Sequence, residues 1–174
     1  MLIDLRDLLS GTKEDLSVTA DIEMNVIDTG ISSYDIAVKQ PVELSIKKAG
    51  KNKLTITGEG RMTLIIPCDR CLEPVNTDIE YCIDKNVDFN QESEGVEEQE
   101  EQDYIDGYNL DVDKLIFGEV LLNMPGKTLC REDCKGLCLK CGANLNIAEC
   151  GCDRESLDPR MSVFKDILNN FKEV

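Results

Sequence analysis

The sequence contains no histidine and no tryptophan, and the first absence narrows the possible chemistry sharply. Without histidine, a Ser-His or Cys-His nucleophile pair, a histidine general base and a mixed Cys/His zinc site are all excluded. The absence of tryptophan removes only a minor option for stacking. Any zinc would have to bind cysteine sulfur or a carboxylate.

Long apolar segments are also missing. The first ten residues place acidic side chains within an apolar pattern, so they lack the uninterrupted apolar core of a signal peptide. No apolar run approaches the length that spans a membrane. We therefore expect a cytoplasmic protein with no membrane partner. In the reducing cytoplasm thiols stay reduced, which disfavours a disulfide framework as the reason for nine cysteines.

Positive charge is scarce, with 19 basic against 35 acidic residues and a net charge of −16. Such a balance disfavours binding to nucleic acid phosphates. Between Gln91 and Asp111 there are nine acids and no base, so this stretch alone contributes −9. We interpret residues 91–111 as a solvated acidic linker or loop. The alternative is an acidic arm that docks on a basic partner such as a ribosomal protein.

Basic residues are concentrated between Lys39 and Arg70, where seven bases stand against three acids. Four lysines surround an expected hairpin turn at Gly50: Lys47, Lys48, Lys51 and Lys53. These lysines make either a soluble hairpin tip or a weak RNA phosphate contact, because no aromatic residues are interleaved with them.

Cysteine is abundant and its spacing predicts zinc binding. Six cysteines follow the pattern Cys130-x3-Cys134-x3-Cys138-x2-Cys141-x8-Cys150-x-Cys152, and a separate Cys68-x2-Cys71 pair lies upstream. Both thiolates of a CxxC turn can reach one ion at about 2.3 Å. A site of four cysteines has no open position for water or substrate, so such sites are structural far more often than catalytic.

Eight of the nine cysteines divide into two sets of four, which predicts two zinc ions. The favoured partition gives one site of Cys138, Cys141, Cys150 and Cys152 and another of Cys68, Cys71, Cys130 and Cys134. A zinc-ribbon alternative pairs Cys68 and Cys71 with Cys138 and Cys141, and iron-sulfur clusters are a further option. Cys82 lies in an alternating pattern and is given no ligand role.

The first 90 residues alternate with period two, which predicts an antiparallel sheet or small open barrel. The expected strands are 17–24, 34–38, 41–47, 53–66 and 76–89, with a bulge or sharp curve at Gly58 to Gly60. Two helices are expected, one from Val112 to Met124 and one from Asp158 to Phe171. The prediction is an α+β chain with a β-rich domain (1–90), the acidic stretch (91–111), and helices flanking a cysteine-rich zinc-binding segment (112–174).

The residues also carry a family resemblance. Cys68-Asp-Arg-Cys71-Leu72 is followed by Gly136-Leu-Cys138-x2-Cys141-Gly, Asn144-Leu-Asn146, Cys150-Gly-Cys152 and Asp158-Pro-Arg160. This order resembles the bacterial YceD family, with Leu139 where that family's pattern has proline. The resemblance implies a role in the accumulation or processing of large-subunit (23S) ribosomal RNA and in ribosome biogenesis. It implies partners among ribosomal RNA, large-subunit ribosomal proteins and assembly intermediates.

Three classes of function follow, led by a non-catalytic zinc-binding factor for ribosome biogenesis. The first alternative is a thiol and zinc redox switch, which dense thiolates permit. The second is a metal-dependent RNA-processing enzyme, disfavoured because the acids lie in a polar run and not as fixed pairs within strands. Arg70, between the knuckle cysteines, is a candidate either for RNA contact or for damping the charge of a zinc tetrathiolate centre.

Overall fold

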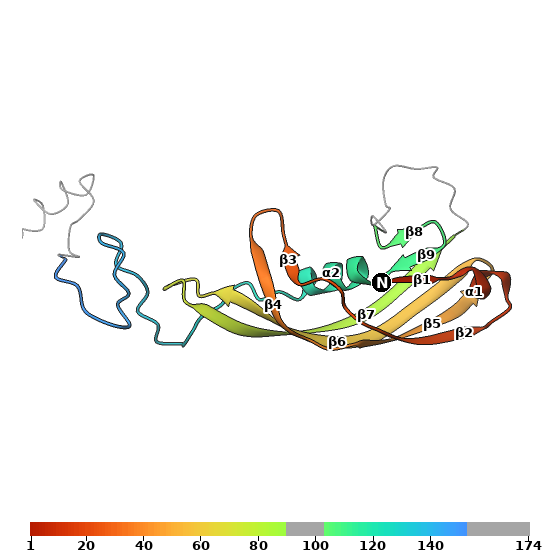
Figure 1. Cartoon of the computed structure of the whole chain (residues 1–174), viewed down its shortest axis with the longest axis horizontal. Coiled ribbons are helices and arrows are strands. Elements are labelled where there is room, and N and C mark those ends of the chain that lie inside the picture. The colour runs from red at the N-terminus through yellow and green to blue at the C-terminus, as the bar shows by residue number, and fades with distance from the viewer. Residues whose placement is uncertain (90–102, 153–174) are drawn as a thin grey trace, which may run out of the picture. The chain divides into compact units, whose positions relative to one another are not determined.

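The computed structural model describes residues 1–89 and 103–152, drawn in colour in Figure 1. The chain divides into two compact units. The first comprises Met1–Asp69 and Glu73–Cys130, and the second comprises Arg70–Leu72 and the residues from Arg131 onward. Two predictions, the helix of 158–171 and most of the acidic stretch, lie outside the described residues.

The first unit is built on a six-stranded antiparallel sheet in which β6 is central (Figure 1). Along one edge β6 pairs with β7 over its whole length, and along the other it pairs first with β5 and then with β4. β2 lies outside β5, and β3 lies outside β4. The strands are β2 (Asp15–Ala20), β3 (Val26–Asp28), β4 (Ser33–Lys39), β5 (Val42–Gly50), β6 (Lys53–Pro67) and β7 (Pro74–Asp88).

Short elements pack around this sheet. The helices are α1 (Arg6–Ser10) and α2 (Val112–Leu122), and a small sheet pairs β1 (Leu2–Asp4), β9 (Asn109–Asp111) and β8 (Ile105–Asp106). Asp111 caps α2 by accepting a hydrogen bond from the N–H of Lys114. Asp113, in the first turn of α2, accepts a hydrogen bond from the N-terminal amino group of Met1 at 2.7 Å. No helix among the described residues is long and apolar enough to cross a membrane.

One face of the six-stranded sheet is the core. Alternate residues of β6 and β7 face this core, and those of the strand middles and most of β6 are buried, as shown by Ile56 and Ile83. Helix α2 adds Leu115 and Val120 to the same cluster. The residues between them, on the opposite face, are polar and exposed in their majority. This alternation is typical of an antiparallel sheet with one solvated face.

The five long strands and the helix at 112 were predictable, and the structure confirms them within a few residues. The hairpin between β5 and β6 turns at Lys51 and Asn52, and Asn52 has φ +59. Of the bulge or sharp curve predicted at Gly58 to Gly60, the bulge is absent, because the register between β6 and β7 runs unbroken there. The pairing of β6 passes from β5 to β4 just beyond these glycines.

The prediction treated 91–111 as a linker or loop. The structure places β8 and β9 within the last seven of these residues and pairs β9 with β1. The expected arrangement of helices flanking the cysteine-rich segment is seen on one side only within the described residues, where α2 precedes it.

The second unit holds almost no regular structure in its described part. One β-bridge joins Leu137 to Asn144, and the enclosed turn is closed by the N–H of Cys138 donating to the carbonyl of Ala143 at 2.8 Å. Its buried side chains are those of Cys71, Cys134 and Cys138. A segment without a buried aliphatic or aromatic side chain has little hydrophobic driving force to fold.

Candidate metal centres

The structure gathers eight cysteines into two groups of four. Within each group the four Sγ atoms all lie within 4.8 Å of one another. The groups are Cys68, Cys71, Cys130 and Cys134 (the first cluster) and Cys138, Cys141, Cys150 and Cys152 (the second cluster). A tetrahedral zinc ion with Zn–S bonds of about 2.3 Å requires sulfurs roughly 3.8 Å apart. Both groups therefore fit a tetrathiolate ion with a small contraction.

The first CxxC pair lies where the longest hairpin reverses direction. β6 ends at Pro67 opposite Pro74, the first residue of β7. The N–H of Cys68 donates to the carbonyl of Glu73 at 2.8 Å, and Leu72 adopts φ +61. The reversal is thus compact enough to hold Cys68 and Cys71 together, which is the geometry that a CxxC chelate needs.

Two polar residues beside the first cluster connect distant parts of the sequence. The N–H of Asp69 donates to the carbonyl of Thr128 at 2.9 Å, and the N–H of Thr128 donates to the Asp69 carboxylate at 2.7 Å. Thr128 is buried. This pair fixes the backbone next to Cys68 and close in sequence to Cys130. Sequence reasoning did not single out either residue.

Arg70 and Asn146 supply hydrogen-bond donors around Cys134. The Arg70 guanidinium donates to the carbonyls of Cys134 at 2.8 Å and Glu132 at 3.4 Å. The Asn146 amide donates to Cys134 Sγ at 3.3 Å, while its oxygen accepts the N–H of Lys135 at 2.8 Å. A donor to sulfur such as Asn146 stabilises a thiolate bound to a metal, whereas Arg70 holds the backbone at Cys134. The only sequence signal for Asn146 was its place in the Asn144-Leu-Asn146 motif.

The second cluster contains thiols with divergent acidity. Backbone N–H groups of Cys141 and Lys140 lower the pKa of Cys138 to about 6. Hydrogen bonding to the neighbouring Cys141 sulfur raises the pKa of Cys152 to about 12. N–H groups directed at a sulfur are the surroundings of a thiolate, the form that binds metal.

The donor set is sulfur only. Thiolates favour zinc, copper(I) and iron-sulfur clusters over hard ions such as magnesium or calcium. Four protein ligands complete a tetrahedral ion and leave no coordination position for a reacting molecule. The chemistry that these two sites support is cross-linking of the chain.

Comparison with known proteins shows to which family the chain is related. The model for the YceD family, "Large ribosomal RNA subunit accumulation protein YceD", matches residues 56–168, which include all eight clustered cysteines. The chain belongs to the YceD family. No solved structure matches it.

Relatives of the YceD-family chain lie in bacteria and plants. An uncharacterized protein of Mycobacterium tuberculosis is 27% identical over 128 residues, covering 73% of this chain and 61% of the relative. The Arabidopsis thaliana protein named "Large ribosomal RNA subunit accumulation protein YCED homolog 1, chloroplastic" is 31% identical over 146 residues, which cover 68% of this chain and 46% of the relative. The Zea mays homolog is 40% identical over 60 residues, covering 32% and 20%. The chain thus spans less than two thirds of these relatives.

The candidate RNA-contact residues of this YceD-family chain lie in different settings. Lys48 Nζ donates to the carbonyl of Leu9 at 3.1 Å, and Lys53 forms an ion pair with Asp88 at 2.8 Å. Lys47 stands opposite Asp15 and Thr55 on the sheet, and Lys51 is exposed in the hairpin turn. Two of these lysines are thus engaged by groups of the chain itself, and the RNA contact stays a prediction.

Proposed function

We propose that this protein is a non-catalytic, zinc-binding factor that promotes the accumulation or processing of large-subunit (23S) ribosomal RNA during ribosome biogenesis. Membership of the YceD family carries the proposal, because the family description and the named plant relative both refer to accumulation of large-subunit ribosomal RNA. Its partners are ribosomal RNA, large-subunit ribosomal proteins or assembly intermediates.

Zinc acts in this proposal as a structural cross-link. Each four-sulfur group offers a closed tetrahedral site. The first cluster joins cysteines of the 68–71 knuckle to cysteines some sixty residues later in the sequence. Bringing ligands so far apart in the sequence together is entropically costly, and the free energy of metal binding to the folded chain would offset that cost.

A non-catalytic role agrees with the character of the two centres. A factor that binds and stabilises a ribosomal precursor needs a shaped surface and no reacting group. Both sulfur clusters are coordinatively complete once an ion is bound, so neither offers a position at which a water molecule or phosphate could be activated.

Metal content is the first test. Native mass spectrometry of protein purified without added metal, before and after a strong chelator, is expected to show loss of two zinc ions. Cys68→Ser should leave one ion and Cys138→Ser should leave the other. Cys82→Ser is the matched control, since Cys82 is exposed on the sheet and belongs to neither cluster, and it should retain two. Intermolecular or intramolecular disulfides in place of metal would contradict the zinc assignment.

Function is tested by complementation. In a bacterial strain lacking its own YceD-family gene, the ratio of 23S to 16S ribosomal RNA should rise towards normal when this chain is expressed. Cys68→Ser should reduce the rescue and Cys82→Ser should not. A normal 23S level in the deletion strain, or failure of the well-folded wild-type chain to change it, would argue against the proposed function.

A further inference from the structure

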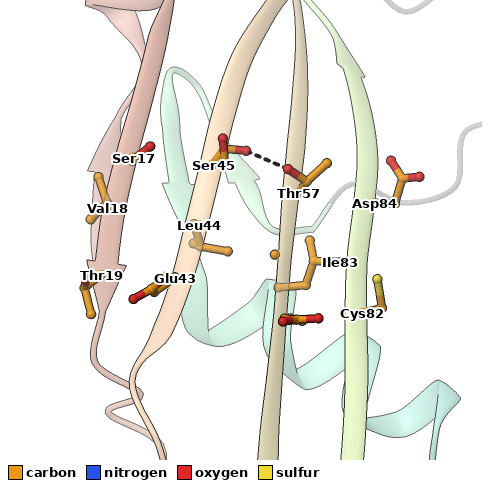
Figure 2. A pocket seen from close by; sticks show the side chains of 12 residues that line it. Ser17, Val18, Thr19, Glu43, Leu44, Ser45, Thr57, Cys82, Ile83 and Asp84 are labelled. Carbon is orange, nitrogen blue, oxygen red and sulfur yellow. Dashed lines mark hydrogen bonds between the residues drawn. The ribbon is translucent and has the colours of Figure 1, made fainter.

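The solvated face of the six-stranded sheet, here called the open face, carries side chains in ordered rows. Figure 2 shows residues from β2, β5, β6 and β7 lying side by side across the strands. The strand register defines two rows: Ser17, Ser45, Thr57 and Asp84, and next to it Thr19, Glu43, Glu59 and Cys82. These rows line a hollow of about 670 Å³ on the face opposite α2.

The charges within this hollow are of one sign. Three carboxylates line it, those of Glu43, Glu59 and Asp84, and no lysine or arginine does. None of the three forms an ion pair with any residue that the structure describes. The nearest arginine along β6, Arg61, is occupied by Asp78 and Glu80.

The register makes this arrangement costly. Glu43 on β5 stands directly opposite Glu59 on β6. Like charges at directly opposed positions destabilise an antiparallel pair, and glutamate is already disfavoured in strands. Neither carboxylate contributes to the core or to a hydrogen bond that holds the sheet together, so stability of the fold does not account for the pair.

A second hollow of about 550 Å³ continues the first, since Glu59 and Cys82 line both. It adds Gln40, Glu80, Tyr81, Asn123 and Arg61, the arginine that is paired with Asp78 and Glu80. The Tyr81 side chain itself belongs to the buried core on the face that α2 covers, so it offers no contact to the open face.

We propose that the open face docks a lysine- and arginine-rich segment of a partner protein. Ammonium or guanidinium groups placed between Glu43 and Glu59 would convert a repulsive pair into attractive contacts. The serine and threonine hydroxyls of the rows can accept hydrogen bonds from the remaining N–H groups of these cations. RNA is the disfavoured occupant, because the three carboxylates repel phosphates. The inference rests on the proposed function in that it makes the ribosome-related partner a basic protein.

The binding test uses two isosteric variants of the full zinc-loaded chain. Glu43→Gln/Glu59→Gln removes the opposed charges and leaves shape unchanged, so its melting temperature should stay equal or rise. Glu94→Gln/Glu97→Gln removes the same charge from the acidic stretch. The probe is a fluorescent synthetic peptide of alternating lysine and glycine, measured by anisotropy at physiological salt. The Glu43/Glu59 variant should bind roughly fivefold more weakly, and the control should match the wild type.

Three outcomes overturn the proposal. Equal weakening by both variants would mean non-specific attraction to a polyanion. Weakening by the Glu94/Glu97 variant alone would place the site in the acidic stretch. Tighter binding of a single-stranded 23S RNA fragment than of the peptide by the wild-type chain, weakened by Glu43→Gln/Glu59→Gln, would make RNA the occupant.

A cellular test separates this inference from the proposed function. In the complementation assay, the charge-reversed Glu43→Lys/Glu59→Lys chain should retain its metal and fail to restore 23S ribosomal RNA. Full rescue by this variant would refute the docking face while leaving the proposed function standing. If the wild-type chain binds the peptide specifically but does not change the 23S RNA level, the docking face would stand and the proposed function would be refuted.

Discussion

Asp69 and Thr128 hold each other by two hydrogen bonds although 59 residues separate them in the sequence. The Asp69 backbone N–H donates to the carbonyl of Thr128, and the Asp69 carboxylate accepts the N–H of Thr128. Because Asp69 follows Cys68 directly and Thr128 precedes Cys130 by two residues, this pair positions ligands from both arms of the first cluster. The metal site therefore depends on a contact that contains no sulfur.

Replacing Asp69 tests this dependence. Asp69→Ala should leave the buried N–H of Thr128 unpaired at a cost of roughly 1–3 kcal/mol. Zinc should then transfer faster from the first cluster to a chromophoric chelator, while the second cluster is unaffected. Asp69→Asn retains a side-chain oxygen that can accept the same hydrogen bond and should keep a near-normal rate. Equal rates for Asp69→Ala and the wild type would show that the pair does not position the site.

Gly60 is required by the ring that lies over it. A Cβ at this position would come within 2.5 Å of Tyr81 Oη and 2.6 Å of its Cζ, so the buried ring would have to shift. Gly60→Ala should therefore destabilise the first unit by about 1–3 kcal/mol in urea denaturation. Gly118→Ala, in α2 with nothing within 4 Å of its added Cβ, should stabilise by about 0.5–1 kcal/mol. Stabilisation by both changes would contradict the packing described for Tyr81.

Lys85 and Glu119 form the most buried ion pair described. Their charged atoms are 2.8 Å apart, with the Glu119 side chain 8% and the Lys85 side chain 26% exposed. Lys85→Met leaves a buried carboxylate without its cation and should lower the free energy of unfolding by about 3 kcal/mol. The double variant Lys85→Met/Glu119→Leu should recover most of that loss. Additive losses in this double-mutant cycle would show that the two side chains act independently.

The carboxyl group of Asp78 offers a titration test on the open face. The Thr63 hydroxyl, which donates to it at 2.6 Å, and the neighbouring Arg61 guanidinium hold its pKa below the ordinary value. A lowered pKa favours the charged form in the folded state, so its stabilising effect is complete above the ordinary value and is lost as pH falls through the folded pKa. Thr63→Val should raise the pKa of Asp78 in carbon-detected NMR titration. Thr57 lies on the same strand as Thr63, but its hydroxyl donates to the carbonyl of Ser45 on β5. Thr57→Val should therefore leave the pKa of Asp78 unchanged.

The long elements of the fold could be predicted because they repeat a period many times. β6 and β7 each alternate over 15 residues, and α2 has a capping aspartate before its apolar positions. The elements that were missed, β1, α1, β3, β8 and β9, have five residues or fewer. A segment that short shows no measurable period, and its conformation is decided by the partner it packs against.

The second cluster followed from spacing, since CxxC and CxC turns joined by a short loop bring four sulfurs together with little entropic cost. The first cluster followed only as the favoured partition of the remaining cysteines, against the zinc-ribbon alternative. The residues that surround the clusters could not be predicted from spacing. Asn146 and the Asp69–Thr128 pair act through contacts between segments far apart in the sequence, and an asparagine or aspartate has many equally good uses in a turn. The opposed glutamates of the open face likewise become visible only when the register of β5 on β6 is known.

The buried side chains of the second unit, within its described part, are all cysteines. Under the proposed zinc binding, its folded population is governed by mass action with the metal. For an ion that binds only the folded form, each tenfold fall in its free concentration above the dissociation constant removes about 1.4 kcal/mol of stability. With zinc as the proposed ligand, the folded fraction of the second unit follows the concentration of free zinc, whereas the first unit, with its aliphatic core, has a separate source of stability.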